Sequence, residues 1–138
     1  MTIFIVDIEA VDTRYTAQWK EYLPKQLQRA INEDVKVISG GETPQATTPG
    51  AFLNFGGTNV YKSKQLETIG EMFCNGQVAD GDYFLYTDAW NPTVIQLKYM
   101  AELLGVNITI GGLWHAGSYD PQDFLGRLIG DKPWVRHA

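Results

Sequence analysis

The chain has 138 residues, of which 44% are hydrophobic and 20% are charged, and its formal net charge is -5. This composition suits one compact domain with a hydrophobic core, and it excludes disordered and fibrous proteins. The acidic charge gives the chain as a whole no electrostatic footprint for a polyphosphate backbone, so a nucleic-acid partner would need a local basic patch or another domain.

The single cysteine, Cys74, excludes an intrachain disulfide and a cysteine-based zinc site, as expected in a reducing cytoplasm. Its position in an apolar helical run predicts a core residue. The N-terminus lacks the basic segment and cleavage site of a signal peptide, and no apolar run approaches the ~20 residues that span a bilayer. We therefore expect a soluble, cytoplasmic protein with no membrane partner.

The first elements predict a βαβ unit. Residues 2 to 6 form a near-continuous apolar run, which is typical of a central parallel strand buried on both faces. A helical pattern follows as far as residue 31, with Thr13 or Thr16 as its N-cap, and Pro24 predicts either a bend or a junction of two short helices. Residues 34 to 39 form the next strand, so the crossover should be right-handed and the sheet parallel.

Residues 40 to 50 are turn-rich and predict a surface loop. A short third strand is possible over residues 51 to 55, followed by Gly56-Gly57 and a helix that runs to about Cys74. Free amides at this helix start, with Lys62 nearby, could hold an anion. The alternative, which we favour, is a glycine turn with a serine or asparagine cap. The spacing of a Walker loop is absent.

The second half of the chain continues the alternation. Residues 82 to 87 predict a strand, Asn91-Pro92 opens a helix that stops at Gly105, and residues 106 to 110 predict another strand. A glycine-rich loop with Trp114, His115, Ser118 and Tyr119 follows, and Asp120-Pro121 starts a final helix. The fold class is therefore α/β, with a Rossmann-like open, mostly parallel sheet of four to five strands and helices on both faces.

Acidic and imidazole groups follow the predicted strands: Asp7 with Glu9, then Asp88, then His115. Parallel topology brings these strand ends together, where ligands bind in open α/β sheets. Such groups could take a proton from a hydroxyl or fix it by hydrogen bonds. For Asp7 we favour a cap of the next turn, for Asp88 a helix cap is equally plausible, and for His115 we favour a functional role.

Trp90, Trp114 and Tyr119 could form flat platforms for sugar rings or bases, although the core is the usual place for any one aromatic residue. No two histidines have the spacing of metal ligands, so no metal site is predicted. The dinucleotide fingerprint Gly-x-Gly-x-x-Gly is also absent, so hydride transfer lacks support.

Six blocks of the sequence, in the same order, resemble the N-terminal part of bacteriophage glycosyltransferases. The blocks are Arg14 to Trp19, Gly50 to Phe55, Thr58 to Ser63, Asp88 to Pro92, Lys98 to Leu103 and Trp114 to Pro121. Together they span nearly the whole chain. These enzymes have two Rossmann domains in the GT-B arrangement and are associated with sugar modification, in some cases of phage DNA bases.

The resemblance implies a single Rossmann-like domain over residues 1–138, which forms the N-terminal half of a two-domain glycosyltransferase. If a phage encodes it, the protein is expected in the cytoplasm of the host cell. The acceptor is then held mainly by this half, and the nucleotide-sugar, a co-substrate, by a C-terminal domain or equivalent chain. No cofactor is expected on this chain and no essential metal. We expect the chain alone to be inactive and able to self-associate through exposed apolar surface.

The resemblance and the strand-end chemistry assign His115 and Asp88 to catalysis. Acceptors could be a DNA base, a glycan or a small molecule, and Arg14, Lys62 and Lys64 could meet phosphates. The expected substrate-binding residues are Asp7, Glu9, Arg14, Thr58, Asn59, Tyr61, Lys62, Trp90, Trp114, Ser118 and Tyr119. The alternative is a non-enzymatic Rossmann-like domain that binds a small anionic ligand or a protein partner.

Overall fold

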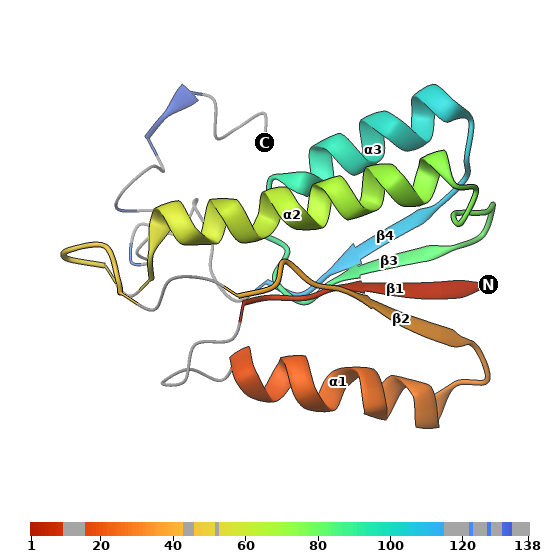
Figure 1. Ribbon diagram of the computed structural model, residues 1–138, viewed down its shortest axis with the longest axis horizontal. Coiled ribbons are helices and arrows are strands. Elements are labelled where there is room, and N and C mark those ends of the chain that lie inside the picture. The colour runs from red at the N-terminus through yellow and green to blue at the C-terminus, as the bar shows by residue number, and fades with distance from the viewer. Residues whose placement is uncertain are drawn as a thin grey trace.

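The computed structural model describes residues 1–9, 16–42, 46–51, 53–114, 122, 127 and 131–133, with the side chains of residues 16–19 outside this description. Strands and helices alternate along the chain (Figure 1). The elements are β1 (Thr2–Val6), α1 (Thr16–Ala30), β2 (Asp34–Ile38), α2 (Phe55–Cys74), β3 (Tyr83–Tyr86), α3 (Thr93–Leu104) and β4 (Thr109–Gly112).

The described strands form one four-stranded sheet in the order β2-β1-β3-β4, and every neighbouring pair is parallel. Helix α1 lies on one face of the sheet, and α2 and α3 lie on the other (Figure 1). The predicted α/β, Rossmann-like fold is therefore confirmed. The chain leaves β1 toward β2 on one side and returns to β3 on the other, so the strand order reverses between β1 and β3. In open α/β sheets, such a reversal creates a crevice at the carboxyl ends of the strands.

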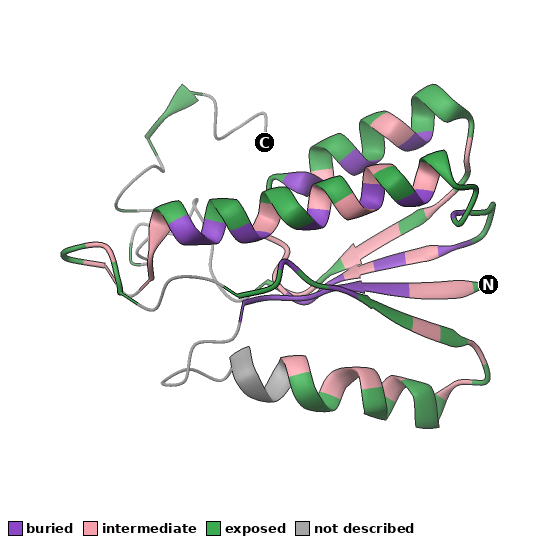
Figure 2. Cartoon of the chain, in the orientation of Figure 1, coloured by how far each residue is buried: buried purple, intermediate pink, exposed green. Residues whose placement is uncertain are grey.

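The main core lies between the sheet and the pair of helices α2 and α3 (Figure 2). Phe4 of β1 and Phe84 of β3 stand side by side with ring centroids 4.9 Å apart, and Ile69 and Leu97 cover them from the helices. Each of these aliphatic side chains is fully buried, which stabilises the fold by roughly 1.5–3 kcal/mol per side chain. This packing fixes α2 against the sheet.

Helix α3 has the predicted start and stop. Asn91 Oδ1 accepts a hydrogen bond from Thr93 N at 3.1 Å, and Gly105 ends the helix in the left-handed region at φ 67°.

The strand predicted over residues 106 to 110 is shifted, because β4 covers Thr109–Gly112. Pairing with β3 sets this register, and the Tyr83 hydroxyl packs against the backbone of Gly111, where a Cβ would displace the Tyr83 side chain.

The strand predicted over residues 51 to 55 is wrong, since none of its described residues is in a strand and Phe55 begins α2. Asn54 caps this helix, because its Oδ1 accepts a hydrogen bond from Gly57 N at 2.7 Å. Thr48 Oγ1 also accepts one from Phe55 N at 2.9 Å. The glycine pair is therefore inside the helix, held there by its cap.

Cys74 is exposed, so its predicted place in the core is wrong. The buried face of α2 passes through Ile69 and Met72, and Cys74, the last residue of the helix, points away from it.

Pro24 lies within the single helix α1, which begins at Thr16. The other cap considered, Thr13, lies outside the described residues.

Candidate functional site

The buried face of α2 changes character along the helix. Near its N-terminus, at the carboxyl ends of the strands, the face carries Thr58, Tyr61 and Gln65; toward its C-terminus it carries Ile69 and Met72. These positions are about one turn apart and share one stripe of the helix. The same helix therefore contributes its second half to the core and its first half to a polar network at the strand ends.

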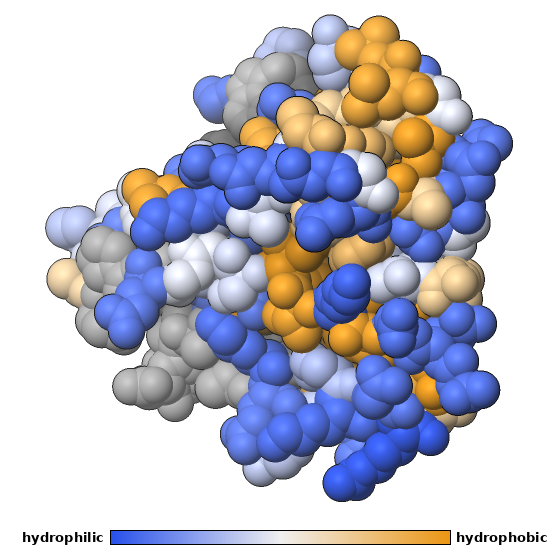
Figure 3. Space-filling model, turned by 45° about the vertical axis from the view of Figure 1, so that its right-hand side comes forward, coloured by the Kyte–Doolittle hydropathy of each residue, from blue (hydrophilic) through white to orange (hydrophobic). Residues whose placement is uncertain are grey.

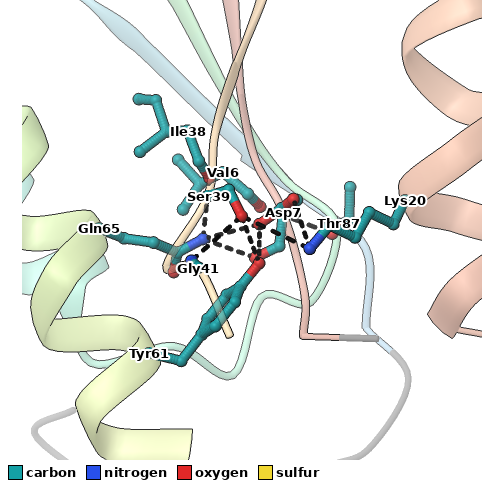
Figure 4. A network of polar contacts seen from close by, with 9 residues as sticks. All are labelled: Val6, Asp7, Lys20, Ile38, Ser39, Gly41, Tyr61, Gln65 and Thr87. Carbon is teal, nitrogen blue, oxygen red and sulfur yellow. Dashed lines mark hydrogen bonds and ion pairs between the residues drawn. The ribbon is translucent and has the colours of Figure 1, made fainter. Parts of the chain in front are cut away.

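Asp7, directly after β1, is the centre of this network (Figure 4). Its side chain is buried, and its Oδ1 accepts hydrogen bonds from the Tyr61 hydroxyl and from Gln65 Nε2, the latter at 3.1 Å. Gln65 Nε2 also lies 2.8 Å from the main-chain oxygen of Asp7 and 2.9 Å from that of Ile38. One amide group thus joins the ends of β1 and β2.

The second carboxylate oxygen of Asp7, Oδ2, is buried and accepts no hydrogen bond from any described residue. Lys20 Nζ, on α1, lies 3.9 Å from it and is partly exposed. Burial raises the pKa of Asp7 to about 6, against the opposing effects of the Tyr61 hydrogen bond and the Lys20 charge. The carboxyl group can therefore exchange a proton near neutral pH.

Lys20 and Ser39 close the network on the side of β2. Lys20 Nζ lies 3.5 Å from Ser39 Oγ, which lies 3.0 Å from the Tyr61 hydroxyl (Figure 4). Gly40 lets this loop reach α2, because a Cβ there would lie 2.2 Å from the Tyr61 main-chain oxygen. Burial first, and then the charge of Asp7, raise the pKa of Tyr61 well above its ordinary value, so the phenol stays a proton donor.

Glu9 is the second buried acid that follows β1. Its Oε1 accepts a hydrogen bond from the hydroxyl of Thr58, which is also buried. Four residues predicted to bind substrate are thus brought together in two pairs, Asp7 with Tyr61 and Glu9 with Thr58. Within each pair the polar groups face one another. We had favoured Asp7 as a cap of the next turn, but its carboxylate contacts α2 through Tyr61.

The ends of β3 and β4 form the rim of this region. Backbone hydrogen bonds from Leu113 N to Tyr86 O (3.0 Å) and from Ala89 N to Leu113 O (2.8 Å) join the two segments that follow these strands. Trp90 is half-buried in the first segment, whereas Trp114 in the second is 69% exposed. The two predicted aromatic platforms therefore belong to one rim.

Asp88 lies in the same rim and is half-buried. Its Oδ1 accepts a hydrogen bond from Trp90 N at 3.1 Å, which shapes the turn after β3. The hydrogen bond at the start of α3 is instead made by Asn91, whose Oδ1 also accepts one from the Thr93 hydroxyl at 2.8 Å. The carboxylate of Asp88 thus positions the backbone of Trp90, and Asn91 is bonded to the first residue of α3.

The start of α2 offers little to an anion. The amides of Phe55, Gly57 and Thr58 already donate to oxygens of Thr48 and Asn54. We had favoured a glycine turn with a serine or asparagine cap. The turn is wrong, because Gly56 and Gly57 lie inside α2, and the asparagine that caps the helix is Asn54, which precedes them. Besides Thr58 and Tyr61, two predicted substrate contacts lie in this first part of the helix: Lys62 is half-buried and Asn59 is exposed. Asn59 Nδ2 donates to the Phe55 oxygen at 2.7 Å.

Sequence reasoning missed four members of the network: Lys20, Ser39, Gln65 and Asn91. Gln65 carried a usable signal, because it lies one turn from Tyr61 and one turn from Ile69 on the buried face of α2. Asn91 Nδ2 lies 3.4 Å from Gln65 Oε1, so the network also includes the segment after β3.

The other predicted site residues, Arg14, His115, Ser118 and Tyr119, lie outside the described residues. Within the described ranges, no group of three or more histidine, cysteine, aspartate or glutamate side chains could hold a metal ion. No helix among those ranges is long and apolar enough to span a membrane.

No protein-family model matches the sequence, and no curated protein or solved structure matches it either. The fold and the strand-end network are therefore the findings on which a function can be argued.

Proposed function

We propose that this chain is the acceptor-binding part of a glycosyltransferase of the GT-B type, and that its acceptor binds at the carboxyl ends of β1, β3 and β4. The sequence blocks and their places in the fold support this proposal. The ordered sequence blocks resemble phage glycosyltransferases, and two of them, residues 58–63 and 88–92, contribute to the strand-end network or its rim. The nucleotide-sugar then binds to a second domain or chain.

The observation that carries the proposal is the exposed indole of Trp114 beside the segment that holds Trp90 and Asp88. A large aromatic surface left in water at a strand-end rim is a common platform for sugar rings and bases, because both have apolar faces. The carboxylate of Asp88 lies within the same rim and suits a hydroxyl partner. Platform and polar group together favour a flat or ring-shaped, hydroxyl-bearing ligand.

In the proposed reaction, an acceptor hydroxyl oxygen bonds to the anomeric carbon of the donor sugar. The bond from that carbon to the nucleotide breaks, and its electron pair leaves with the nucleotide. The hydroxyl proton passes to a base, for which we propose His115 or Asp88. Asp7, behind the rim, holds the ends of β1 and β2 in place through Tyr61 and Gln65.

Binding tests the platform directly. Nuclear magnetic resonance titration of the chain with a methyl glycoside and with a nucleoside should shift the indole signals of Trp90 and Trp114. Trp114→Ala should weaken binding of the preferred ligand by about tenfold, because one base or sugar stack contributes roughly 1–3 kcal/mol. The control is Tyr22→Ala, which removes another exposed aromatic ring, on α1.

Inorganic phosphate serves as the ionic probe in the same titration. If phosphate shifts signals at the start of α2 while the glycoside and nucleoside shift nothing at the rim, the acceptor proposal is wrong and an anion-binding domain replaces it. Equal affinities of the native chain and Trp114→Ala for the preferred ligand would equally count against the platform.

Catalysis is tested in the natural protein that contains these residues. His115→Ala and Asp88→Asn should each lower the rate of sugar transfer by about 100-fold or more if the residue takes the acceptor proton. Circular dichroism confirms that each variant is folded. Near-native transfer by both folded variants would remove them from catalysis.

A further inference from the structure

Helix α3 carries an exposed apolar stripe. Ile95, Tyr99 and Leu103 follow one another at intervals of one helical turn and are 49%, 61% and 67% exposed. The opposite side of the helix, with Leu97 and Ala101, is fully buried in the core. The stripe is therefore surplus to folding of the described domain. Figure 3 shows hydrophobic side chains gathered over this part of the molecule.

One flank of this stripe carries an ion pair. Lys98 Nζ lies 3.2 Å from Glu102 Oε1, and both side chains are mostly exposed. Lysine one turn before glutamate is the less favourable order on a helix, because each charge then opposes the helix dipole. The pair thus contributes little to the helix itself and is free to exchange partners.

We propose that the α3 stripe, Ile95, Tyr99 and Leu103 with Lys98 and Glu102 on its flank, is the contact between two copies of this chain in an antiparallel two-fold dimer. In such a dimer, the charged flanks of the two α3 helices lie side by side and run in opposite directions. Lys98 of one copy then lies opposite Glu102 of the second copy, and the reverse.

The apolar residues are also self-complementary in this arrangement. With the two-fold axis between Tyr99 and Met100, the two Tyr99 rings meet, and Ile95 lies beside Leu103 of the second copy at both ends. A central aromatic residue with aliphatic neighbours is typical of the energetically dominant part of an interface. The apolar residues and the charged flank of α3 are therefore both self-complementary, and α3 combines the two features on one face.

A single helix face buries less surface than a standard interface, so the dimer should be weak and concentration-dependent. We expect a dissociation constant on the order of 10–100 µM. This inference does not depend on the proposed function. The strand-end rim plays no part in it, so either can fail without the other.

The test is sedimentation equilibrium of the chain from about 5 µM to about 500 µM, a range that brackets the expected dissociation constant. Lys98→Glu and Glu102→Lys should each raise the dissociation constant by about tenfold or more, because like charges then face each other. Mixed in equal amounts, the two variants should form a heterodimer, since an all-acidic flank then meets an all-basic one.

The matched control is the pair Lys25 and Glu21, which has the same spacing and similar exposure on α1, across the sheet. Lys25→Glu and Glu21→Lys should leave the dissociation constant unchanged. Tyr99→Ala should abolish dimerisation at the same concentrations.

Three results would overturn the proposal. One is a monomer at every concentration, which is also expected if a further domain or another protein covers the stripe. Another is a dimer that Tyr99→Ala leaves intact. The third is a mixture of the charge variants that associates no better than either variant alone.

Discussion

Two buried aspartates lie at opposite ends of the β1 and β3 pair and differ in their partners. Asp82, before β3, is 4% exposed, and both of its oxygens accept hydrogen bonds from backbone amides, Thr2 N at 2.8 Å and Ala79 N at 2.9 Å. Asp7, after β1, is bonded by side chains at one oxygen, while its other oxygen accepts no hydrogen bond from a described residue.

This difference separates a structural carboxylate from a candidate functional one. Two rigid backbone amides hold Asp82 and satisfy both of its oxygens. Asp7 lies where ligands bind in this class of sheet, and its burial favours the protonated form. The same isosteric change, aspartate to asparagine, should therefore have opposite effects at the two ends.

Asp7→Asn should give the largest change. Burial raises the pKa of Asp7 from 3.8 to about 6. At pH 7 its ionisation therefore costs the folded state up to about 3 kcal/mol relative to the unfolded chain. Asparagine cannot ionise, so the free energy of unfolding, measured by urea denaturation, should rise by up to that amount, reduced by the cost of burying its NH₂ group at the Oδ2 position.

The pH dependence fixes the sign of this effect. Below the ordinary pKa of 3.8, the Asp7 carboxyl group is protonated in both the folded and the unfolded chain. As the pH rises from there through the folded-state pKa of about 6, the unfolded chain ionises first and the free energy of unfolding falls. Between those values the free energy of unfolding should fall more steeply for the native chain than for Asp7→Asn. Parallel curves for the two proteins would show that Asp7 is ionised at no cost.

Asp82→Asn should act in the opposite direction and somewhat less strongly. One carboxylate oxygen becomes an NH₂ group that faces a backbone N–H, so a buried donor loses its acceptor. We expect the free energy of unfolding at pH 7 to fall by about 2 kcal/mol. If both asparagine variants are stabilised, or both destabilised, the distinction between the two ends of the sheet is wrong.

Tyr61→Phe should have the smallest effect on stability, about 1 kcal/mol, and a clear effect on titration. Its hydroxyl donates to Asp7 and lowers the pKa of that carboxyl group. Removing it should raise the Asp7 pKa further, as measured by carboxyl ¹³C resonance. Tyr86→Phe is the control, because the buried Tyr86 hydroxyl bonds to Thr93 instead. A pKa that moves equally in both variants would argue against the direct contact.

Much of the fold could be predicted because local signals agreed with the tertiary structure. The apolar run of β1 and the Asn91 and Gly105 signals around α3 needed no knowledge of distant contacts. β4 was placed too early, since its glycines have low strand propensity and only the pairing with β3 draws them into the sheet. Long-range pairing is the information that periodicity lacks.

The site was predicted in outline but not in its details. Acids after strands point to the carboxyl edge of a parallel sheet, which correctly placed Asp7, Glu9 and Asp88 there. Gln65 was missed, because a glutamine within a helix is usually a surface residue, and only the tertiary fold turns this one inward. Lys20 was missed for a related reason: its neighbours come from elements distant in sequence.

The amide of Gln65 has a consequence for any ligand that arrives at the strand ends. Its bonds to the main-chain oxygens of Asp7 and Ile38, and its contact with Asn91, fix segments that follow three different strands. The conformational entropy of these segments is thus lost during folding and not again on association. A ligand at this edge meets a preorganised surface, and more of its interaction energy remains as affinity.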